Sequence, residues 1–188
     1  MSPSDDAPEL VKPEFSLVIA LADVGDRARN FRFKPSEEER AAIAARLDLL
    51  TLTRFEGEGR VRPWRKAGLV FEGHFIADLT QACVVSLEPV ADHLEADFIV
   101  HYLPQDMIDE WEKKQAEDGD IIIDSENDEP VDPIVNGMID VGESAVQQLA
   151  LSVNPYPRKS DVSFEPPASA AAPKENPFAV LEKLKKTD

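Results

Sequence analysis

Cysteine, histidine and long apolar segments are scarce in this sequence. Its 188 residues include one cysteine and three histidines. A single cysteine rules out an internal disulfide bond and fits a reducing compartment. No apolar run approaches the roughly 18 residues of a membrane-spanning helix, and the acidic start, MSPSDDAPEL, lacks the basic and apolar regions of a signal peptide. We therefore expect a cytoplasmic protein that does not interact with membranes.

Residues suited to catalysis or metal binding are equally sparse. A nucleophilic Cys83 would need a neighbouring base, and no histidine lies in a recognisable catalytic pattern. The three histidines are His74, His93 and His101. A zinc site would need further ligands, because Ser86 stands where a C-x-x-C spacing would place a second cysteine. Together with the lack of a glycine-rich phosphate loop, this predicts no enzyme, no metal, no cofactor and no small-molecule substrate.

Acidic residues, in contrast, are abundant and unevenly distributed. The net charge is −17. Residues 103–143 contain fourteen acidic residues against two lysines, whereas residues 27–66 contain eleven basic residues against six acidic ones. An acidic surface repels phosphate backbones and attracts basic proteins, although an excess of charge also keeps a protein soluble. Both interpretations of the acids stay open at this point.

The first quarter of the chain predicts a strand followed by a helix. Apolar residues alternate over residues 15–21, which indicates a strand that ends near Gly25. Ser36 and Glu39 have the spacing of a capping box at a helix start. The helix face expected to meet the core carries Ile43, Leu47 and Leu50.

Residues 50–102 change to the period-two alternation of strands. One set of like-oriented residues comprises Leu69, Phe71, Phe75, Ala77 and Leu79, and a second comprises Leu94, Ala96, Phe98, Val100 and Tyr102. After them, residues 105–115 fit a short helix, and Asp140 begins another with Glu143 as its N3 partner. The pattern predicts an α+β fold: a curved antiparallel β-sheet, partly barrel-like, packed by two or three helices.

Composition divides the chain into four parts. Residues 1–13 predict a disordered tail, residues 14–164 a single domain, and residues 165–175 a Pro/Ala linker. Residues 176–188 predict a short helix with Asn176 as N-cap. The linker and this helix form a flexible C-terminal arm. Phe178 and Leu181 on the helix are candidate partner-binding residues, because an exposed phenylalanine indicates a pocket to receive it.

Four sequence elements in a fixed order resemble one known family. Residues 81–90 (QACVVSLEPV) carry Cys83, Leu87, Glu88 and Pro89, as in a C-x-x-C-L-E-P element whose second cysteine is replaced. Residues 39–50 precede this element, and residues 143–157 and 176–185 follow it. Over residues 15–186 the chain is similar to the YceD family of large ribosomal RNA subunit accumulation proteins. The resemblance implies a non-enzymatic cytoplasmic factor that supports the synthesis, processing or stability of large-subunit ribosomal RNA.

Two molecular routes fit this role. In the first, a basic ribosomal protein or assembly factor binds an acidic loop, whose spacing does not match a calcium-binding loop. The candidate residues of the loop are Asp118, Asp120, Asp124, Glu126 and Asp128. In the second, ribosomal RNA contacts a basic cluster that begins at Arg54 and includes Arg60, Arg62, Trp64, Arg65 and Lys66. The alternative for this cluster is a set of outward-facing hairpin residues that balance the acids.

Overall fold

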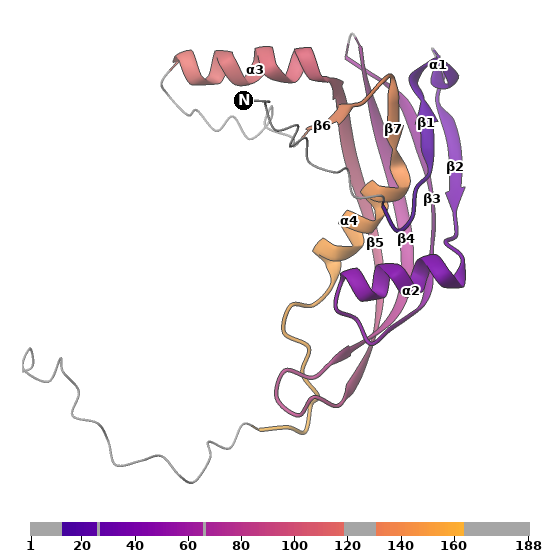
Figure 1. Cartoon of the computed structure of the whole chain (residues 1–188), viewed down its shortest axis with the longest axis vertical. Coiled ribbons are helices and arrows are strands. Elements are labelled where there is room, and N and C mark those ends of the chain that lie inside the picture. Colours follow the sequence, from indigo (N-terminus) through magenta and orange to yellow (C-terminus); the bar gives the residue numbers. More distant parts are fainter. Residues whose placement is uncertain (1–12, 26, 66, 119–130, 164–188) are drawn as a thin grey trace, which may run out of the picture.

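The computed structural model describes residues 13–25, 27–65, 67–118 and 131–163. In these residues it contains four helices and seven strands (Figure 1). Their order is β1 (Val18–Ala20), α1 (Leu21–Val24), β2 (Arg29–Phe33), α2 (Glu37–Arg46), β3 (Thr51–Trp64), β4 (Gly68–Ala82), β5 (Pro89–Pro104), α3 (Gln105–Asp118), β6 (Val131–Ile134), β7 (Met138–Asp140) and α4 (Val141–Ser152). The predicted α+β class is confirmed.

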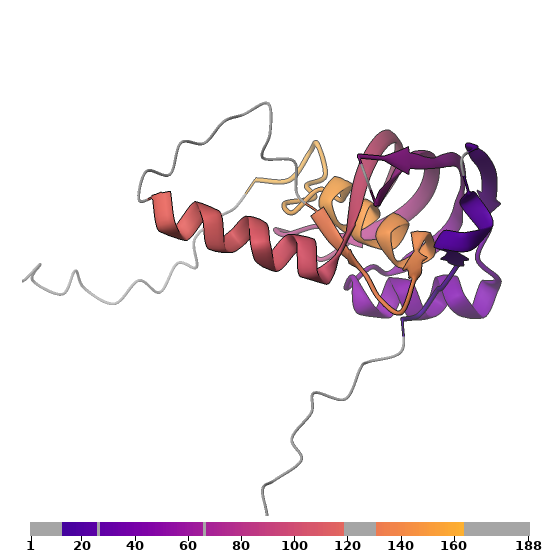
Figure 2. The ribbon, with the colours of Figure 1, turned by 90° about the horizontal axis from the view of Figure 1, so that it is seen from above.

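The main sheet is open. Its strand order is β2-β3-β4-β5-β6, with antiparallel neighbours except for the parallel pair β5 and β6. Strands β2 and β6 form its two edges, and they are much shorter than the 14 to 16 residues of β3, β4 and β5. The predicted curvature is present, since the sheet bends around α4 (Figure 2). The partial closure toward a barrel is not confirmed, because the short edge strands do not pair with each other.

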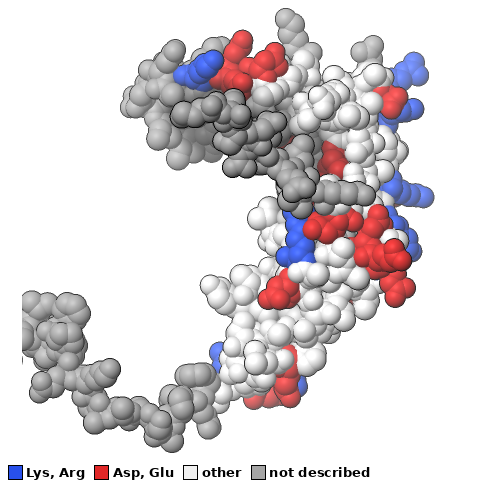
Figure 3. Space-filling view, in the orientation of Figure 1, with Lys and Arg blue, Asp and Glu red and all other residues white. Residues whose placement is uncertain are grey.

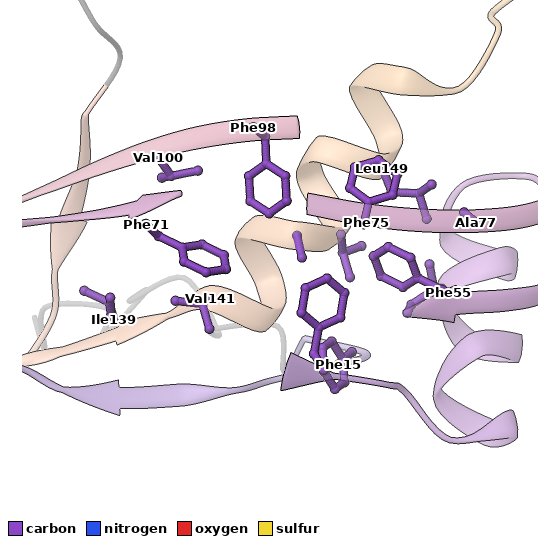
Figure 4. Packing of buried hydrophobic residues seen from close by; sticks show 14 of the residues in the cluster. Phe15, Phe55, Phe71, Phe75, Ala77, Phe98, Val100, Ile139, Val141 and Leu149 are labelled. Carbon is purple, nitrogen blue, oxygen red and sulfur yellow. The ribbon is translucent and has the colours of Figure 1, made fainter. Parts of the chain in front are cut away.

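The inward face of the sheet follows the predicted alternation. Along β4, the side chains of Leu69, Phe71, Phe75, Ala77 and Leu79 are all buried. On β5, Phe98, Val100 and Tyr102 are buried, and Leu94 and Ala96 pack against the core. Helix α4 contributes Val141, Ala145, Val146 and Leu149 to the same core, so the sheet and this helix enclose one apolar layer (Figure 4).

Two glycines let aromatic rings lie directly on the sheet. A Cβ atom at Gly73 would collide with the ring of Phe98, and one at Gly59 would collide with the ring of Phe71. Each ring therefore covers the backbone of a neighbouring strand, which compensates for the missing side chain. Substituting either glycine would displace a buried phenylalanine.

Helix α2 begins as predicted and ends earlier than predicted. Ser36 Oγ accepts a hydrogen bond from the Glu39 backbone N–H at 3.3 Å, and Glu39 Oε2 accepts one from the Ser36 N–H at 2.7 Å. The helix ends at Arg46, and Asp48 at φ 53° then redirects the chain. Ile43 is buried and Leu47 half-buried, but Leu50 is exposed, so the expectation for Leu50 was wrong because its helical spacing no longer applies.

The predicted first strand is shortened to the three residues of β1. Its partner β7 is equally short, and the chain continues as α1 from Leu21. Residue Leu17, just before β1, is instead tied to the start of α4, because its N–H donates to Asp140 Oδ1 at 2.9 Å and its carbonyl accepts from the Val141 N–H. Strand length is therefore limited by the partner rather than by the apolar pattern.

Asp140 caps α4 as predicted, but Glu143 does not complete a capping box. Asp140 Oδ1 accepts from the N–H groups of Gly142 and Glu143. The Glu143 carboxylate accepts two hydrogen bonds from Arg46 at 2.8 and 2.9 Å, and Glu14 accepts a third at 2.8 Å. Arg46 on α2 thus joins α4 to the N-terminal segment, and this pairing lowers the pKa of Glu14.

Candidate functional site

The residues around Cys83 form a closed turn between β4 and β5. The Cys83 N–H donates to the Glu88 carbonyl at 2.8 Å, and the Leu87 N–H donates to the Cys83 carbonyl at 2.9 Å. The Cys83 side chain has no exposed surface. Hydrogen bonding from Ser86 and from the backbone N–H of Lys159 lowers the pKa of Cys83 to about 6. These contacts fix the position of the sulfur within the turn.

This turn packs against the segment that follows α4. The Val84 N–H donates to the Pro157 carbonyl at 2.9 Å, and the Gln81 side chain donates to the Asn154 carbonyl at 2.9 Å. Lys159 Nζ and Glu88 Oε2 form an ion pair at 2.9 Å, which lowers the pKa of Glu88. The structure therefore brings together two of the sequence elements, residues 81–90 and 143–157, that are far apart in the chain.

We call three exposed apolar side chains on these two segments the knuckle surface. It consists of Val84, Leu87 and Tyr156. Leu87 is 76% exposed and has φ 60°, a left-handed conformation that costs a leucine roughly 1–2 kcal/mol. Glycine or asparagine would suit this turn better for folding alone. The sequence indicated Leu87 and Tyr156 as members of two elements of the family resemblance, whereas Val84 was not singled out.

Three arginines of the basic cluster, Arg54, Arg60 and Arg62, are paired with acids in the part of the chain that the structure describes. Arg60 and Arg62 both pair with Glu72, at 3.7 and 2.7 Å, and the hydrogen bonds from Arg62 lower the pKa of Glu72. Arg54 pairs with Glu56 at 2.6 Å. The Trp64 ring contacts the His101 ring in a tilted arrangement, with 4.3 Å between ring centroids and 44° between their planes, and Arg65 lies 4.2 Å above Trp64. The interpretation as outward-facing residues that balance acids therefore fits Arg54, Arg60 and Arg62.

These pairs belong to a larger outer face of the sheet, on the side away from α2 and α4. Charged side chains alternate with the buried ones along β2 to β5 and meet across neighbouring strands. Further ion pairs are Arg32 with Glu58 and Lys34 with Glu56, and the rings of His74 and His93 hydrogen-bond with Asp97 and Asp78. Interspersed charges largely cancel the field that would attract a polyanion. Figure 3 looks onto the opposite, helix-covered side, where acidic side chains gather over α2 and basic side chains lie along the β2 edge.

Several candidate residues lie outside the described part of the chain. These are Lys66, Asp120, Asp124, Glu126, Asp128, Phe178 and Leu181, with the linker, the C-terminal helix and residues 1–12 of the predicted tail. Asp118 ends α3. The described part contains no helix long and apolar enough to cross a membrane.

The chain is thus an α+β protein with an open sheet, a cysteine turn held against the segment after its last described helix, and a strongly acidic sequence. A comparison with known families identifies the group more closely. The model of the family described as large ribosomal RNA subunit accumulation protein YceD matches residues 71–185, and the chain belongs to this family. The match begins in β4 and includes the cysteine turn, β5, β6, β7 and α4. No curated protein and no solved structure matches the chain significantly.

Proposed function

We propose that this chain supports the accumulation of large-subunit ribosomal RNA by binding a basic ribosomal protein or assembly factor. The family name connects the chain with this RNA. The proposal assigns it a binding role in the cytoplasm, without catalysis. Acidic residues would recognise the partner, and exposed apolar residues would add contact area.

The observation that carries the proposal is the pairing of bases on the outer face. RNA binding draws its affinity from basic residues that replace counterions on the phosphates. Arg60 and Arg62 share the carboxylate of Glu72, and Arg54 is held by Glu56, so RNA would have to compete with these acids. The net charge of −17 opposes the approach of RNA further. The same charge speeds association with a basic protein.

The second candidate function is direct contact with ribosomal RNA. Arg65 favours it, because this exposed arginine lies over Trp64 at the turn between β3 and β4. An arginine stacked on tryptophan presents a cation and an aromatic ring together, which suits an unpaired base. This pair is small beside the paired Arg54, Arg60 and Arg62, so we rank direct RNA contact second.

Affinity capture with and without nuclease distinguishes the two functions. The tagged full-length chain is used as bait beside a variant in which Asp118, Asp120, Asp124, Glu126 and Asp128 are changed to the corresponding amides. The proposal predicts that a basic large-subunit protein or assembly factor is recovered after nuclease treatment, less at high salt and less by the variant. Recovery of such proteins only when RNA is intact, and equally by the variant, would favour direct RNA contact.

A further inference from the structure

A groove is lined by residues of β1, the β6–β7 hairpin and helix α4. Its volume is about 380 Å³. Apolar walls come from Val18, Val135 and Met138, which are 54%, 56% and 42% exposed. The charged lining residues are Asp132, Asp140 and Glu143, and no lysine or arginine is among the lining. The groove therefore has mainly apolar walls, and all of its charged lining residues are acidic.

Two of these three acids already have partners. Asp140 accepts hydrogen bonds from the backbone at Leu17, Gly142 and Glu143 as the cap of α4. Glu143 is paired with Arg46 through two hydrogen bonds. Neither carboxylate lacks a donor, so neither needs a ligand.

Asp132 is different. It lies on the edge strand β6 in register with Tyr102 of β5, whose hydroxyl bonds Ser144 at 2.6 Å. Asp132 is half-buried, and its carboxylate makes no hydrogen bond or ion pair with any side chain or backbone group that the structure describes. Burial raises its pKa, because the charged carboxylate has lost water without gaining a donor. A cation arriving from outside would restore a favourable partner for this group.

We propose that this groove receives a short segment of a basic protein, with a lysine or arginine cation on Asp132 and an apolar side chain against Val18 and Met138. The volume is at the lower end of roughly 300–1,000 Å³ for ligand pockets, which suits one or two side chains. Because the lining contains acids but no lysine or arginine, its charge complements a basic side chain. The exposed apolar walls can contact an apolar side chain of the same segment. This inference rests on the proposed function, from which it takes the class of partner, a basic protein.

A charge on an edge strand also has a known protective role, because inward-pointing charges discourage the pairing of sheet edges between molecules. That role would explain Asp132 alone. It would not explain three exposed apolar side chains around it, which a protective device would avoid. The two roles predict different results for the same substitution.

A titration followed by methyl and amide NMR tests the groove directly. The full-length chain is titrated with a blocked Leu-Lys dipeptide, and separately with blocked Leu-Gln and Leu-Glu. We expect Leu-Lys to shift the methyl signals of Val18 and Met138, and Leu-Gln and Leu-Glu to bind at least about tenfold more weakly. Asp132→Asn should weaken Leu-Lys binding about tenfold, whereas Asp161→Asn, an equal change of charge at an exposed site, should leave it unchanged. Unchanged amide signals away from the groove will show that each variant is folded.

Three results would overturn the proposal. The first is an absence of groove shifts with Leu-Lys, or equal binding of Leu-Gln. The second is unchanged binding by Asp132→Asn accompanied by self-association in sedimentation, which would assign Asp132 to edge protection. The third is a shift of the groove signals when Lys183, Lys185 and Lys186 are changed to glutamine without any peptide, which would assign the groove to the chain's own C-terminal residues. Because no ribosomal component is present, failure of this titration leaves the proposed function standing, and failure of the capture experiment leaves the groove standing.

Discussion

The outer face of the sheet and the groove beside β6 hold acids in opposite settings. On the outer face, Glu72 lies between Arg60 and Arg62, and pairing lowers its pKa. In the groove, Asp132 lies beside Tyr102 without a cation, and burial raises its pKa. Glu72 on the outer face is neutralised by arginines of the same chain. Asp132 in the groove has no such partner, and our proposal assigns it a cation from another protein. The comparison teaches that a count of charges does not locate a binding surface, whereas the pairing of each charge does.

Gly73→Ala should have the largest effect on stability, because it disturbs strand β4, which carries residues of the outer face. The added Cβ would collide with the ring of Phe98, which is buried against the core. We expect the free energy of unfolding to fall by about 2 kcal/mol, as for overpacked cores. Denaturant unfolding measures this loss, and Ile99→Ala on the exposed side of the same sheet should change stability by less than about 0.5 kcal/mol. Equal effects of the two variants would contradict this packing.

Arg46→Gln should have the next largest effect and should sharpen the comparison. It removes the cation from Glu143, so a second groove carboxylate keeps only the hydrogen bond from Gln147 at 3.1 Å. We expect a loss of about 1 kcal/mol, because these partly exposed hydrogen bonds are screened by water, together with severalfold tighter binding of the Leu-Lys dipeptide. Arg32→Gln, which breaks an exposed pair, is the control for both measurements.

The same network makes a pH prediction. The pKa of Glu14 is lowered in the folded chain by its hydrogen bond to Arg46. A carboxyl with a lowered pKa adds stability above its unfolded pKa, and this stability disappears as pH falls through the folded value. Thermal unfolding between neutral and acidic pH should therefore show a smaller loss in Arg46→Gln than in the unaltered chain. An identical pH dependence in both chains would mean that the pairing contributes nothing.

Leu87→Asn concerns the knuckle surface and should have a smaller effect of opposite sign. Asparagine tolerates the left-handed backbone at φ 60° better than leucine does, and Leu87 is exposed. We expect unfolding free energy to rise by about 0.5 kcal/mol. The measurement is the melting temperature, with Val84→Asn in the same turn as the control. A lower melting temperature for Leu87→Asn would show that Leu87 serves the fold itself.

Glu72→Gln should produce the smallest change in stability but the most informative change in binding. It releases Arg60 and Arg62 from their shared carboxylate. We expect affinity for a large-subunit ribosomal RNA fragment to rise about threefold at 50 mM salt and the gain to vanish near 200 mM, because the new contacts are to phosphates. Filter binding measures both values. Unchanged affinity would mean that the pairing on the outer face does not limit RNA binding.

Local signals predicted much of the fold. The capping box at Ser36 and the alternation along β4 and β5 depend on neighbouring residues, and both are confirmed. The α+β class follows from them. Expectations that depended on residues distant in the sequence were less successful. Strand β1 is only as long as its partner β7, and Glu143 pairs with Arg46, 97 residues away, instead of completing a capping box. The sheet stays open because its edge strands are short, and the alternation in the sequence did not distinguish short strands from long ones.

The candidate site was predictable only in part. The motif indicated Leu87 and Glu88, and the cluster of bases was visible, but its neutralisation by Glu72 appears only when β3 and β4 are aligned. Asp132 carried one weak signal, an acid within the apolar β6 run of Val131, Pro133 and Ile134. Its lack of a partner is a property of the packed structure and could not be read from spacing.

The level of large-subunit ribosomal RNA in cells tests the central claim most directly. Cells carry, as their only copy, either the chain with Asp118, Asp120, Asp124, Glu126 and Asp128 changed to amides or the chain with Arg60, Arg62, Arg65 and Lys66 changed to glutamine. Our account predicts that the acid variant loses this RNA, while the base variant retains most of it and both proteins remain folded and abundant. Loss of the RNA in the base variant, with a normal level in the acid variant, would contradict the account and establish direct RNA contact as the better one.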